Sequence, residues 1–220
     1  MLNKKTKHNI LLGILITFGI IIMQIPFTKI IGSNLQFSLF DFYGPVMGAF
    51  LGSIWGILVV AVMELINWAM HGFTITAGTM IRLLPMLFAT LYFAKKSRVI
   101  LLVPMVAMIG FWATPEGQKA WYYALYWLIP VVCYFVYDRS AIFRALGATF
   151  TAHAVGGVLF AWFIKLPAAV WIGLIPVVWK ERGLMTIGIY LTYLAGQKLF
   201  ALATKKWGVE MPQVVAQEKK

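Results

Sequence analysis

The sequence contains little charge and almost no cysteine. Only 12% of the 220 residues are charged, about half of the share that soluble domains carry. The single cysteine, Cys133, excludes an intrachain disulfide and a cysteine-rich metal site. The chain also lacks HxxxH, CxxC and GxxxxGK[ST] patterns. We therefore expect no metal ion and no cofactor, and the protein itself is not expected to be an ATPase.

Acidic residues are the scarcer of the two charge types. The 7 Asp and Glu residues stand against 19 Lys and Arg residues, which gives a net charge of +12. An excess of this kind occurs in nucleic-acid-binding proteins, but here the basic residues form short clusters beside apolar segments. Such clusters are typical of the cytoplasmic flanks of membrane spans. Because no basic face interleaved with stacking aromatic residues occurs, we expect no nucleic-acid partner.

Apolar residues fill most of the sequence. They make up 61% of the chain, including 16 Phe, 9 Trp and 9 Tyr, whereas soluble domains contain about 45–50%. This composition predicts an all-α membrane protein in the cell membrane, in contact with lipid, with one integral membrane domain over 1–220. Basic flanks at both ends predict that both termini, including a tail over 204–220, are cytoplasmic.

Several apolar segments are candidates for spans. They cover 9–31, 44–63, 79–93, 99–113, 120–137, 145–164 and 184–203. Two cytoplasmic termini require an even number of crossings. We therefore expect a six-span helical bundle with one additional short re-entrant or surface segment. No small-x-small cleavage site follows the first segment, so we expect it to be a retained span.

Two topologies fit this count. If 44–63 is re-entrant, the basic clusters at 95–98 and 138–144 both lie inside, as the positive-inside tendency favours. If 99–113 lies along the surface instead, 44–63 spans and 95–98 lies outside. Length favours the second topology, because 44–63 offers 20 uncharged residues against 15. Both topologies place the connection 166–183 outside.

A stripe of glycines opens the second segment. Gly44, Gly48, Gly52 and Gly56 are spaced by four and share one face of a helix. Small residues let a neighbouring helix approach closely, which is a common way of packing helices in lipid. The regular stripe favours an unbroken helix and therefore the second topology.

Ionisable residues within the apolar segments mark a candidate substrate site. Glu64, Asn67 and His71 share one helix face at i, i+3 and i+7, and Arg82 and His153 lie in later segments. A charge at the centre of a membrane helix costs about 2.5–3.5 kcal/mol, so such groups face a bundle interior or a cavity. Either Glu64 pairs with Arg82, or both face a pocket and meet a ligand. His153 is either an interior group with its own partners or a ligand contact.

Two connecting stretches add further candidates. Asp41 lies among Phe40, Phe42 and Tyr43, where it either clamps a planar or cationic molecule or belongs to an interfacial anchor. The connection 166–183 combines aromatic side chains with donors and acceptors. Its candidate residues are Trp171, Lys180, Glu181 and Arg182. Aromatic walls with a few oriented polar groups are typical of small-molecule sites, and the alternative is a helix start with snorkelling basic residues.

Three motifs resemble a known family. FxLFDFYGPVMGAFLG (37–52) and ELINWAMHG (64–72) are similar to the substrate-binding S components of energy-coupling factor vitamin transporters, in particular the riboflavin type. In that family a short acidic loop leads into a GP-small-small helix, an ELxxN-like run and a glycine turn. GLIPVVWKERGLMTIGIYLTY (173–193) resembles the same family's Pro-rich, Lys-containing approach to the final helix. The gap between the GP and ELIN elements is longer here than in the riboflavin type.

The resemblance implies a fold, a site and partners. It implies six spans, both ends cytoplasmic, and a ligand site that is capped by outer loops. It places Asp41, Glu64, Asn67 and the cluster 180–182 near the ligand. A transmembrane coupling subunit and ATPases are the implied partners. We therefore expect a membrane-embedded binding subunit for uptake of a small micronutrient, vitamin-like or heterocyclic, rather than an enzyme.

Two other functions fit parts of the sequence. The glycine stripe suits an accessory or scaffold subunit of a larger membrane complex. Cys133, Arg139 or Arg144, and His153 follow the order Cys, Arg, His, which resembles the exosortase and archaeosortase transpeptidases. Cys133 lies inside a span, however, and 138–144 is cytoplasmic in both topologies, which is the wrong side for that chemistry.

Overall fold

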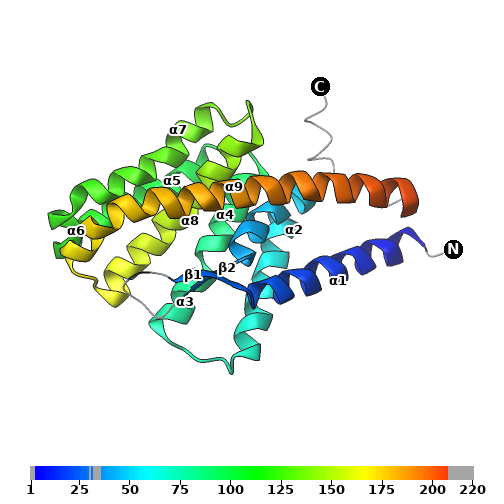
Figure 1. Ribbon diagram of the computed structural model, residues 1–220, viewed down its shortest axis with the longest axis horizontal. Coiled ribbons are helices and arrows are strands. Elements are labelled where there is room, and N and C mark those ends of the chain that lie inside the picture. The colour runs from blue at the N-terminus through cyan, green and yellow to red at the C-terminus, as the bar shows by residue number, and fades with distance from the viewer. Residues whose placement is uncertain (1–2, 30, 32–35, 208–220) are drawn as a thin grey trace.

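The computed structural model describes residues 3–29, 31 and 36–207 (Figure 1). Apart from one short hairpin of strands, the described chain is helical, which confirms the predicted all-α class. The elements in chain order are α1 (Lys4–Met23), β1 (Pro26–Lys29), β2 (Gln36–Ser38), α2 (Phe40–Met70), α3 (Ala77–Leu83), α4 (Pro85–Ala94), η1 (Val99–Leu101), α5 (Leu102–Trp112), α6 (Pro115–Lys119), η2 (Trp121–Leu128), α7 (Ile129–Phe135), α8 (Ala141–Leu159), η3 (Phe160–Ile164) and α9 (Ala168–Trp207). Most of the tail predicted over 204–220 lies outside the described residues.

Helix α2 folds back on itself at Gly52. This glycine has φ 79° and ψ 175°, a non-helical conformation in the middle of the element, and it is a conformation that essentially only glycine adopts. A Cβ added at Gly56 would lie 2.8 Å from the Cα of Gly48, whereas residues eight apart in a straight helix are separated by about 12 Å. The element is therefore a helical hairpin with a first arm before Gly52 and a second arm after it. The expectation of an unbroken glycine-striped helix is wrong.

The other glycines of the stripe allow close contacts. Gly44 faces the side chain of Met86, and Gly48 faces the backbone of Thr90, both in α4. Gly56 in the second arm lies against Gly48 in the first. The same spacing therefore serves two purposes, since three glycines admit close neighbours and the fourth reverses the chain.

The last described stretch is one helix rather than a loop followed by a span. Helix α9 continues for 40 residues with Pro176 inside it, a length of about 60 Å. The predicted connection 166–183 and the predicted span 184–203 both belong mostly to this helix, which crosses the whole view in Figure 1. Pro176 disfavours a helix locally, but apolar surroundings penalise any backbone that leaves its N–H and C=O groups unpaired, and a helix pairs them.

Other segments also divide differently from the prediction. The segment expected at 79–93 consists of α3 and α4. They meet at Leu84, whose backbone is still in the α region, because Pro85 has no N–H with which to continue the helical hydrogen bonds. The segment expected at 120–137 begins as the 3-10 helix η2 and continues as α7. The stretch between the expected segments 99–113 and 120–137 contains the short helix α6.

Both ends of the described chain lie at one end of the bundle. Figure 1 shows the start of α1 and the end of α9 on the same side. Phe50, two residues before the Gly52 reversal, stacks on Phe200 of α9 with ring centroids 4.5 Å apart. The tip of the α2 hairpin therefore lies at this end as well.

The basic clusters of the sequence gather there too, and we call this the basic end. Lys96, just after α4, pairs with Asp138, just before α8, at 2.6 Å, so the two basic loops are neighbours. Ala94 at the end of α4 lies beside Gly48 of the hairpin. The basic flanks recognised from the sequence thus share one end of the bundle with the termini.

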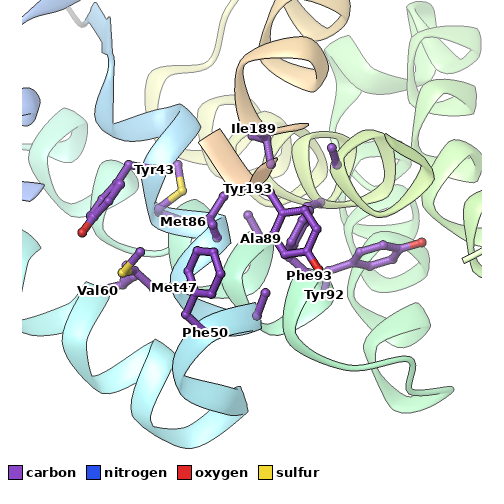
Figure 2. Packing of buried hydrophobic residues seen from close by; sticks show 14 of the residues in the cluster. Tyr43, Met47, Phe50, Val60, Met86, Ala89, Tyr92, Phe93, Ile189 and Tyr193 are labelled. Carbon is purple, nitrogen blue, oxygen red and sulfur yellow. The ribbon is translucent and has the colours of Figure 1, made fainter. Parts of the chain in front are cut away.

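Two aromatic-rich clusters form the core. The first joins both arms of α2 to α4 and α9, and Phe50, Phe93 and Tyr193 lie close together in it (Figure 2). The rings of Phe50 and Tyr193 are stacked with centroids 5.8 Å apart. The second cluster packs α5, η2, α8 and the first part of α9 around Phe111 and Trp127. Buried rings at these junctions fix the helices relative to one another.

The outer surface of the bundle is apolar. By length and composition alone, 4 helical stretches of the described chain could cross a membrane, namely Thr6–Met23, Phe40–Met70, Ala77–Ala94 and Ala141–Ile164, although Phe40–Met70 is folded back at Gly52. Large apolar side chains point outward, among them Ile54 at 74% exposure, Val99 at 71% and Phe135 at 74%. A surface of this kind suits contact with lipid tails, so the fold is compatible with membrane insertion.

Candidate functional site

A cavity of about 110 Å³ lies at the end of the bundle opposite the basic end. Both arms of α2, together with α3, η2, α8 and the first half of α9, surround it. Its polar and charged lining residues are Asp41, Glu64, Arg82, Tyr123, His153, Glu181 and Arg182. Apolar and aromatic walls come from residues such as Ile81, Met86 and Trp171. Ile31, which is 47% exposed, also lines the cavity, so the cavity reaches the surface there.

Most of the substrate residues predicted from the sequence line this one cavity. The exceptions are Asn67 and Lys180. Asn67 accepts a hydrogen bond from Gln24 Nε2 at 2.8 Å outside the cavity, and Lys180 is exposed on α9. The structure thus brings together residues that lie far apart in sequence, and their role in ligand binding stays a prediction.

The reversal at Gly52 is what brings two of the carboxylates together. Asp41 lies in the first turn of α2, rather than in the loop where it was expected, and Glu64 lies near the end of the second arm. In a straight helix these two residues would be about 35 Å apart. Asp41 Oδ2 accepts a hydrogen bond from the backbone N–H of Ser38 at 2.8 Å. Glu64 is 7% exposed and borders the cavity.

Arg82 reaches the cavity from the last turn of α3. Its guanidinium donates a hydrogen bond to the carbonyl of Gln36 in β2. Among the residues that the structure describes, no ion pair joins Arg82 to Glu64, although both line the cavity. The simple structural pair considered from the sequence is therefore not formed.

Arg182 is buried in the cavity wall with few partners. It is 5% exposed, and its guanidinium lies 4.7 Å from the ring centroid of Phe37. Nη1 contacts the sulfur of Met185 at 3.1 Å, which is a weak acceptor. Nη2 lies 4.0 Å from the carboxylate of Glu181, too far for a hydrogen bond. Within the described part of the chain, Nε has no hydrogen-bond partner.

His153 is an interior group with partners on both ring nitrogens. Trp127 Nε1 donates to His153 Nδ1 at 3.1 Å, and Tyr123 Oη lies 2.8 Å from His153 Nε2. An indole N–H can only donate, so Nδ1 must be the unprotonated acceptor. The proton of the neutral ring is therefore on Nε2, which donates to the Tyr123 hydroxyl. Tyr123 lines the cavity, so the remaining O–H of its hydroxyl is available to a group inside it.

Tyr123 and Trp127 are site residues that sequence reasoning missed. At the start of an apolar segment, aromatic residues fit equally well into an interfacial belt, so the sequence gives no reason to place these two in a site. In the structure both are buried, at 2% and 0% exposure. One signal in the sequence points to them. Tyr123 and Trp127 are four residues apart, and the next apolar segment contains a histidine. Because buried Tyr, Trp and His side chains all require hydrogen-bond partners, these residues are candidates for contact with one another.

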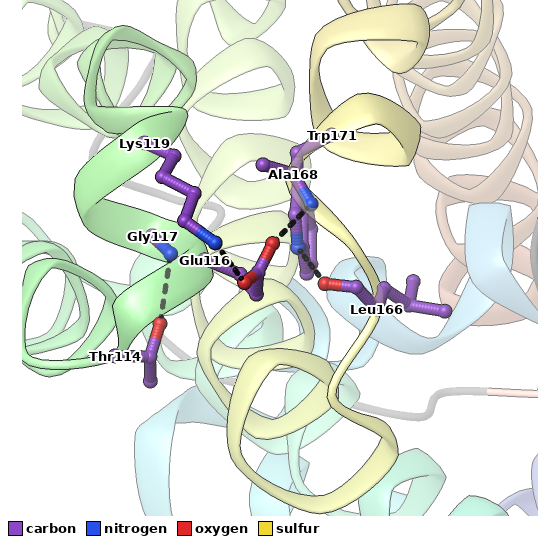
Figure 3. A network of polar contacts seen from close by, with 7 residues as sticks. All are labelled: Thr114, Glu116, Gly117, Lys119, Leu166, Ala168 and Trp171. Atoms are coloured by element: carbon purple, nitrogen blue, oxygen red, sulfur yellow. Dashed lines mark hydrogen bonds and ion pairs between the residues drawn. The ribbon is translucent and has the colours of Figure 1, made fainter.

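A polar network beside the cavity connects α6 to the start of α9 (Figure 3). Glu116 Oε1 accepts from Lys119 Nζ at 2.7 Å, and Oε2 accepts from the backbone N–H of Ala168 at 2.7 Å. These hydrogen bonds, that of Lys119 first, hold the pKa of the Glu116 carboxyl below its ordinary value. Trp171 donates to the carbonyl of Leu166 at 3.0 Å, which fixes its ring in the cavity wall.

A second hollow has a different character. An apolar groove of about 700 Å³ runs between α1, the first arm of α2 and the second half of α9. Its lining includes Leu15, Phe18, Phe50 and Leu199, and no charged side chain. The groove therefore offers dispersion contacts and hardly any directional polar contact.

The residues considered for thiol chemistry do not meet at this cavity. Within the described residues, no group of three or more His, Cys, Asp or Glu side chains is placed to hold a metal ion. Cys133 is buried in the first core cluster and does not line the cavity that contains His153. Arg144 lies over the ring of Tyr137 at 4.9 Å. The Cys, Arg, His order of the sequence is therefore not assembled around this cavity.

Comparisons with known proteins leave the family open. The chain is 26% identical over 210 residues to an uncharacterized protein of Methanocaldococcus jannaschii, MJ0923, covering 84% of this chain and 69% of that protein. No family model matches the sequence. No solved structure matches it either.

Proposed function

We propose that this chain is a multi-pass membrane protein that binds a small micronutrient, vitamin-like or heterocyclic, for uptake with an ATP-driven coupling module. The observation that carries the proposal is the cavity, where Asp41, Glu64, Arg82 and Arg182 meet between apolar helices. Charged groups of this kind are costly in a membrane protein and usually mark a pathway or a ligand site. Apolar walls with a few convergent polar groups are typical of small-molecule sites.

The proposed topology has six crossings and a re-entrant α2. The crossings are α1, α3 with α4, η1 with α5, η2 with α7, α8 and α9. Because α2 starts and ends on the cavity side, the basic clusters at 95–98 and 138–144 then lie with the termini on the cytoplasmic side, in agreement with the positive-inside tendency. The cavity then opens to the outside, where an uptake protein meets its substrate.

A binding panel tests the proposal. The full chain is purified in nanodiscs and titrated with vitamins and small heterocycles by calorimetry. We expect at least one compound to bind with micromolar or tighter affinity, and Glu64→Gln and Arg82→Gln to weaken it about tenfold or more, the effect of losing a charged contact. Lys180→Gln serves as the control, since Lys180 lies outside the cavity. If nothing in the panel binds, the proposal is wrong.

The coupling module needs its own experiment. Co-expression with candidate ATPase and coupling subunits, followed by purification through a tag on this chain, should yield a stable complex. The apolar groove favours a second candidate function, an accessory or scaffold subunit of a larger membrane complex. Recovery of a stable complex that contains no transport ATPase, together with failure of the panel, would favour that alternative.

A further inference from the structure

The lining of the cavity carries both donors and acceptors. Arg182 and Tyr123 present N–H and O–H donors, and Asp41 and Glu64 present carboxylate oxygens. We propose that Arg182 and Tyr123 clamp an oxyanion of the ligand, such as a carboxylate, and that the ligand is a small amphoteric molecule whose nitrogen faces Asp41 and Glu64. This inference rests on the proposed function and names its substrate class.

The first argument is the unsatisfied guanidinium of Arg182. A buried guanidinium with five N–H groups normally binds oxygens, often a carboxylate in a bidentate manner. Among the described residues, Arg182 has a sulfur at 3.1 Å and a carboxylate at 4.0 Å, and its Nε has no partner. A buried cation with so few acceptors is stabilised when a ligand supplies oxygens.

The second argument is the direction of the Tyr123 hydroxyl. Trp127 fixes His153 in the tautomer that donates from Nε2, and the Tyr123 oxygen accepts that donation. Tyr123 must then use its own proton as a donor elsewhere, and no acceptor for it is found within the described chain. Trp127 and His153 therefore act as positioning residues. Trp127 sets the tautomer of His153, and His153 donates to the Tyr123 oxygen, which leaves the Tyr123 proton as a donor.

The third argument is the excess of carboxylates in the lining. Asp41 Oδ2 is bonded to the Ser38 backbone, but no hydrogen bond to the carboxylate of Glu64 occurs among the described residues. An anion alone would meet three carboxylates as well as two guanidinium groups in this lining. A ligand that also carries a protonated or N–H-bearing nitrogen matches both kinds of group, which is why we infer an amphoteric molecule.

Cavity volume limits the size of the ligand. The 110 Å³ found here is below the about 150 Å³ of an engineered cavity that accepts benzene. A flavin is therefore too large for the cavity in this form. A compact ligand, with any remaining part directed toward Ile31 at the surface, fits better.

The experiment compares acids with their amides. Two matched pairs serve as probes, β-alanine with β-alaninamide and glycine with glycinamide, titrated by calorimetry against the full chain in nanodiscs. We expect an acid to bind at least about tenfold more tightly than its amide, because the amide lacks the oxyanion for Arg182. Tyr123→Phe and Arg182→Lys should bring the acid-to-amide ratio toward one, and Lys180→Gln should leave it unchanged.

The ratio separates binding from folding, because both members of a pair are measured on the same sample. Arg182→Lys keeps the charge, so it tests the geometry of the guanidinium if Arg182→Gln does not fold. Equal binding of acid and amide by the wild-type chain overturns the clamp. Binding of a panel compound that has no oxyanion, with no binding of either acid, also overturns it while the proposed function stands. If no panel compound and no probe binds, both proposals fail.

Discussion

The charged cavity and the apolar groove share two elements but differ in almost everything else. Both are lined by α2 and α9, yet the cavity measures about 110 Å³ and the groove about 700 Å³. The cavity wall carries Asp41, Glu64, Arg82 and Arg182, whereas the lining of the groove carries no charge. Size is therefore a poor guide to the site. Convergent polar groups distinguish a place that selects a ligand from one that lipid tails can fill.

The face of α2 and the position along α9 explain the difference. On α2, Asp41 and Glu64 line the cavity, whereas Phe42 and Phe50 of the first arm line the groove. The first half of α9 lines the cavity, and its second half lines the groove. We therefore expect substitutions near the groove to change stability and substitutions in the cavity to change binding.

Phe50→Ala should give the largest loss of stability. Phe50 is 2% exposed and packs on Tyr193 and Phe200 beside the groove. Removing such a ring costs about 3–5 kcal/mol in the free energy of unfolding, which is measured by thermal and denaturant unfolding in detergent. Phe50→Leu keeps a large apolar side chain, so it should cost less than Phe50→Ala and keep ligand affinity unchanged. A Phe50→Leu protein that folds but no longer binds would contradict the separation of the two regions.

Gly52→Ala should damage stability and binding together. The φ of 79° and ψ of 175° leave no room for a Cβ without strain, so we expect a loss of about 1–3 kcal/mol. Because Gly52 brings Asp41 and Glu64 to the same cavity, affinity for the panel ligand should fall as well. Gly13→Ala is the matched control, since nothing lies within 4 Å of a Cβ there. Equal melting temperatures for the two variants would speak against the reversal.

Trp127→Phe should have a smaller effect on stability and a specific effect on the cavity. It removes the N–H that donates to His153 Nδ1 at 3.1 Å, leaving a buried acceptor unpaired at a cost of about 1–3 kcal/mol. His153 is then free to exchange tautomers, so the direction of the Tyr123 hydroxyl is lost. NMR of ¹⁵N-labelled imidazole should show one tautomer in the wild-type chain and a mixture in the variant. Trp121→Phe, at an exposed position, should leave the tautomer unchanged.

Glu116→Gln should produce the smallest effect, visible in the pH dependence. The pKa of Glu116 is lowered in the folded protein by Lys119 and by the N–H of Ala168. A lowered folded-state pKa stabilises the protein above the unfolded-state value, and this contribution is lost as the pH falls through the folded-state value. The melting temperature of the wild-type chain should therefore fall more steeply on acidification than that of the variant. Identical slopes would show that the contact contributes nothing to stability.

The chemistry of the cavity was more predictable than its shape. Glu64, Arg82 and His153 were recognised because ionisable groups in apolar segments must face something other than lipid. Tyr123 and Trp127 were not, because an aromatic residue at the start of a span reads equally well as an interfacial anchor. Their roles depend on hydrogen bonds to a distant segment, which spacing along the chain does not reveal.

Backbone features were the least predictable part of the fold. Gly52 has the same spacing as Gly48 and Gly56, so the sequence could not separate the residue that reverses the chain from those that admit a neighbour. The continuity of α9 was hidden for a similar reason, since Pro176 favours a loop locally while apolar surroundings favour a helix. The two topologies considered from the sequence differed in whether 44–63 spans or is re-entrant. The reversal at Gly52 is consistent with the re-entrant form, which the distribution of basic residues favoured.

One consequence of the reversal concerns how the chain is threaded during synthesis. In the proposed topology the α2 hairpin enters and leaves the membrane on the same side, so it does not change the number of crossings. A straightened α2 would be long enough to cross, at about 46 Å, and would turn everything after residue 70 to the other face. The orientation of the later helices then depends on a single residue without a side chain, together with the basic loops around Lys96 and Arg139 that resist translocation. Gly52 thereby determines whether α2 counts as a crossing, and with it the side of the membrane on which each later helix begins.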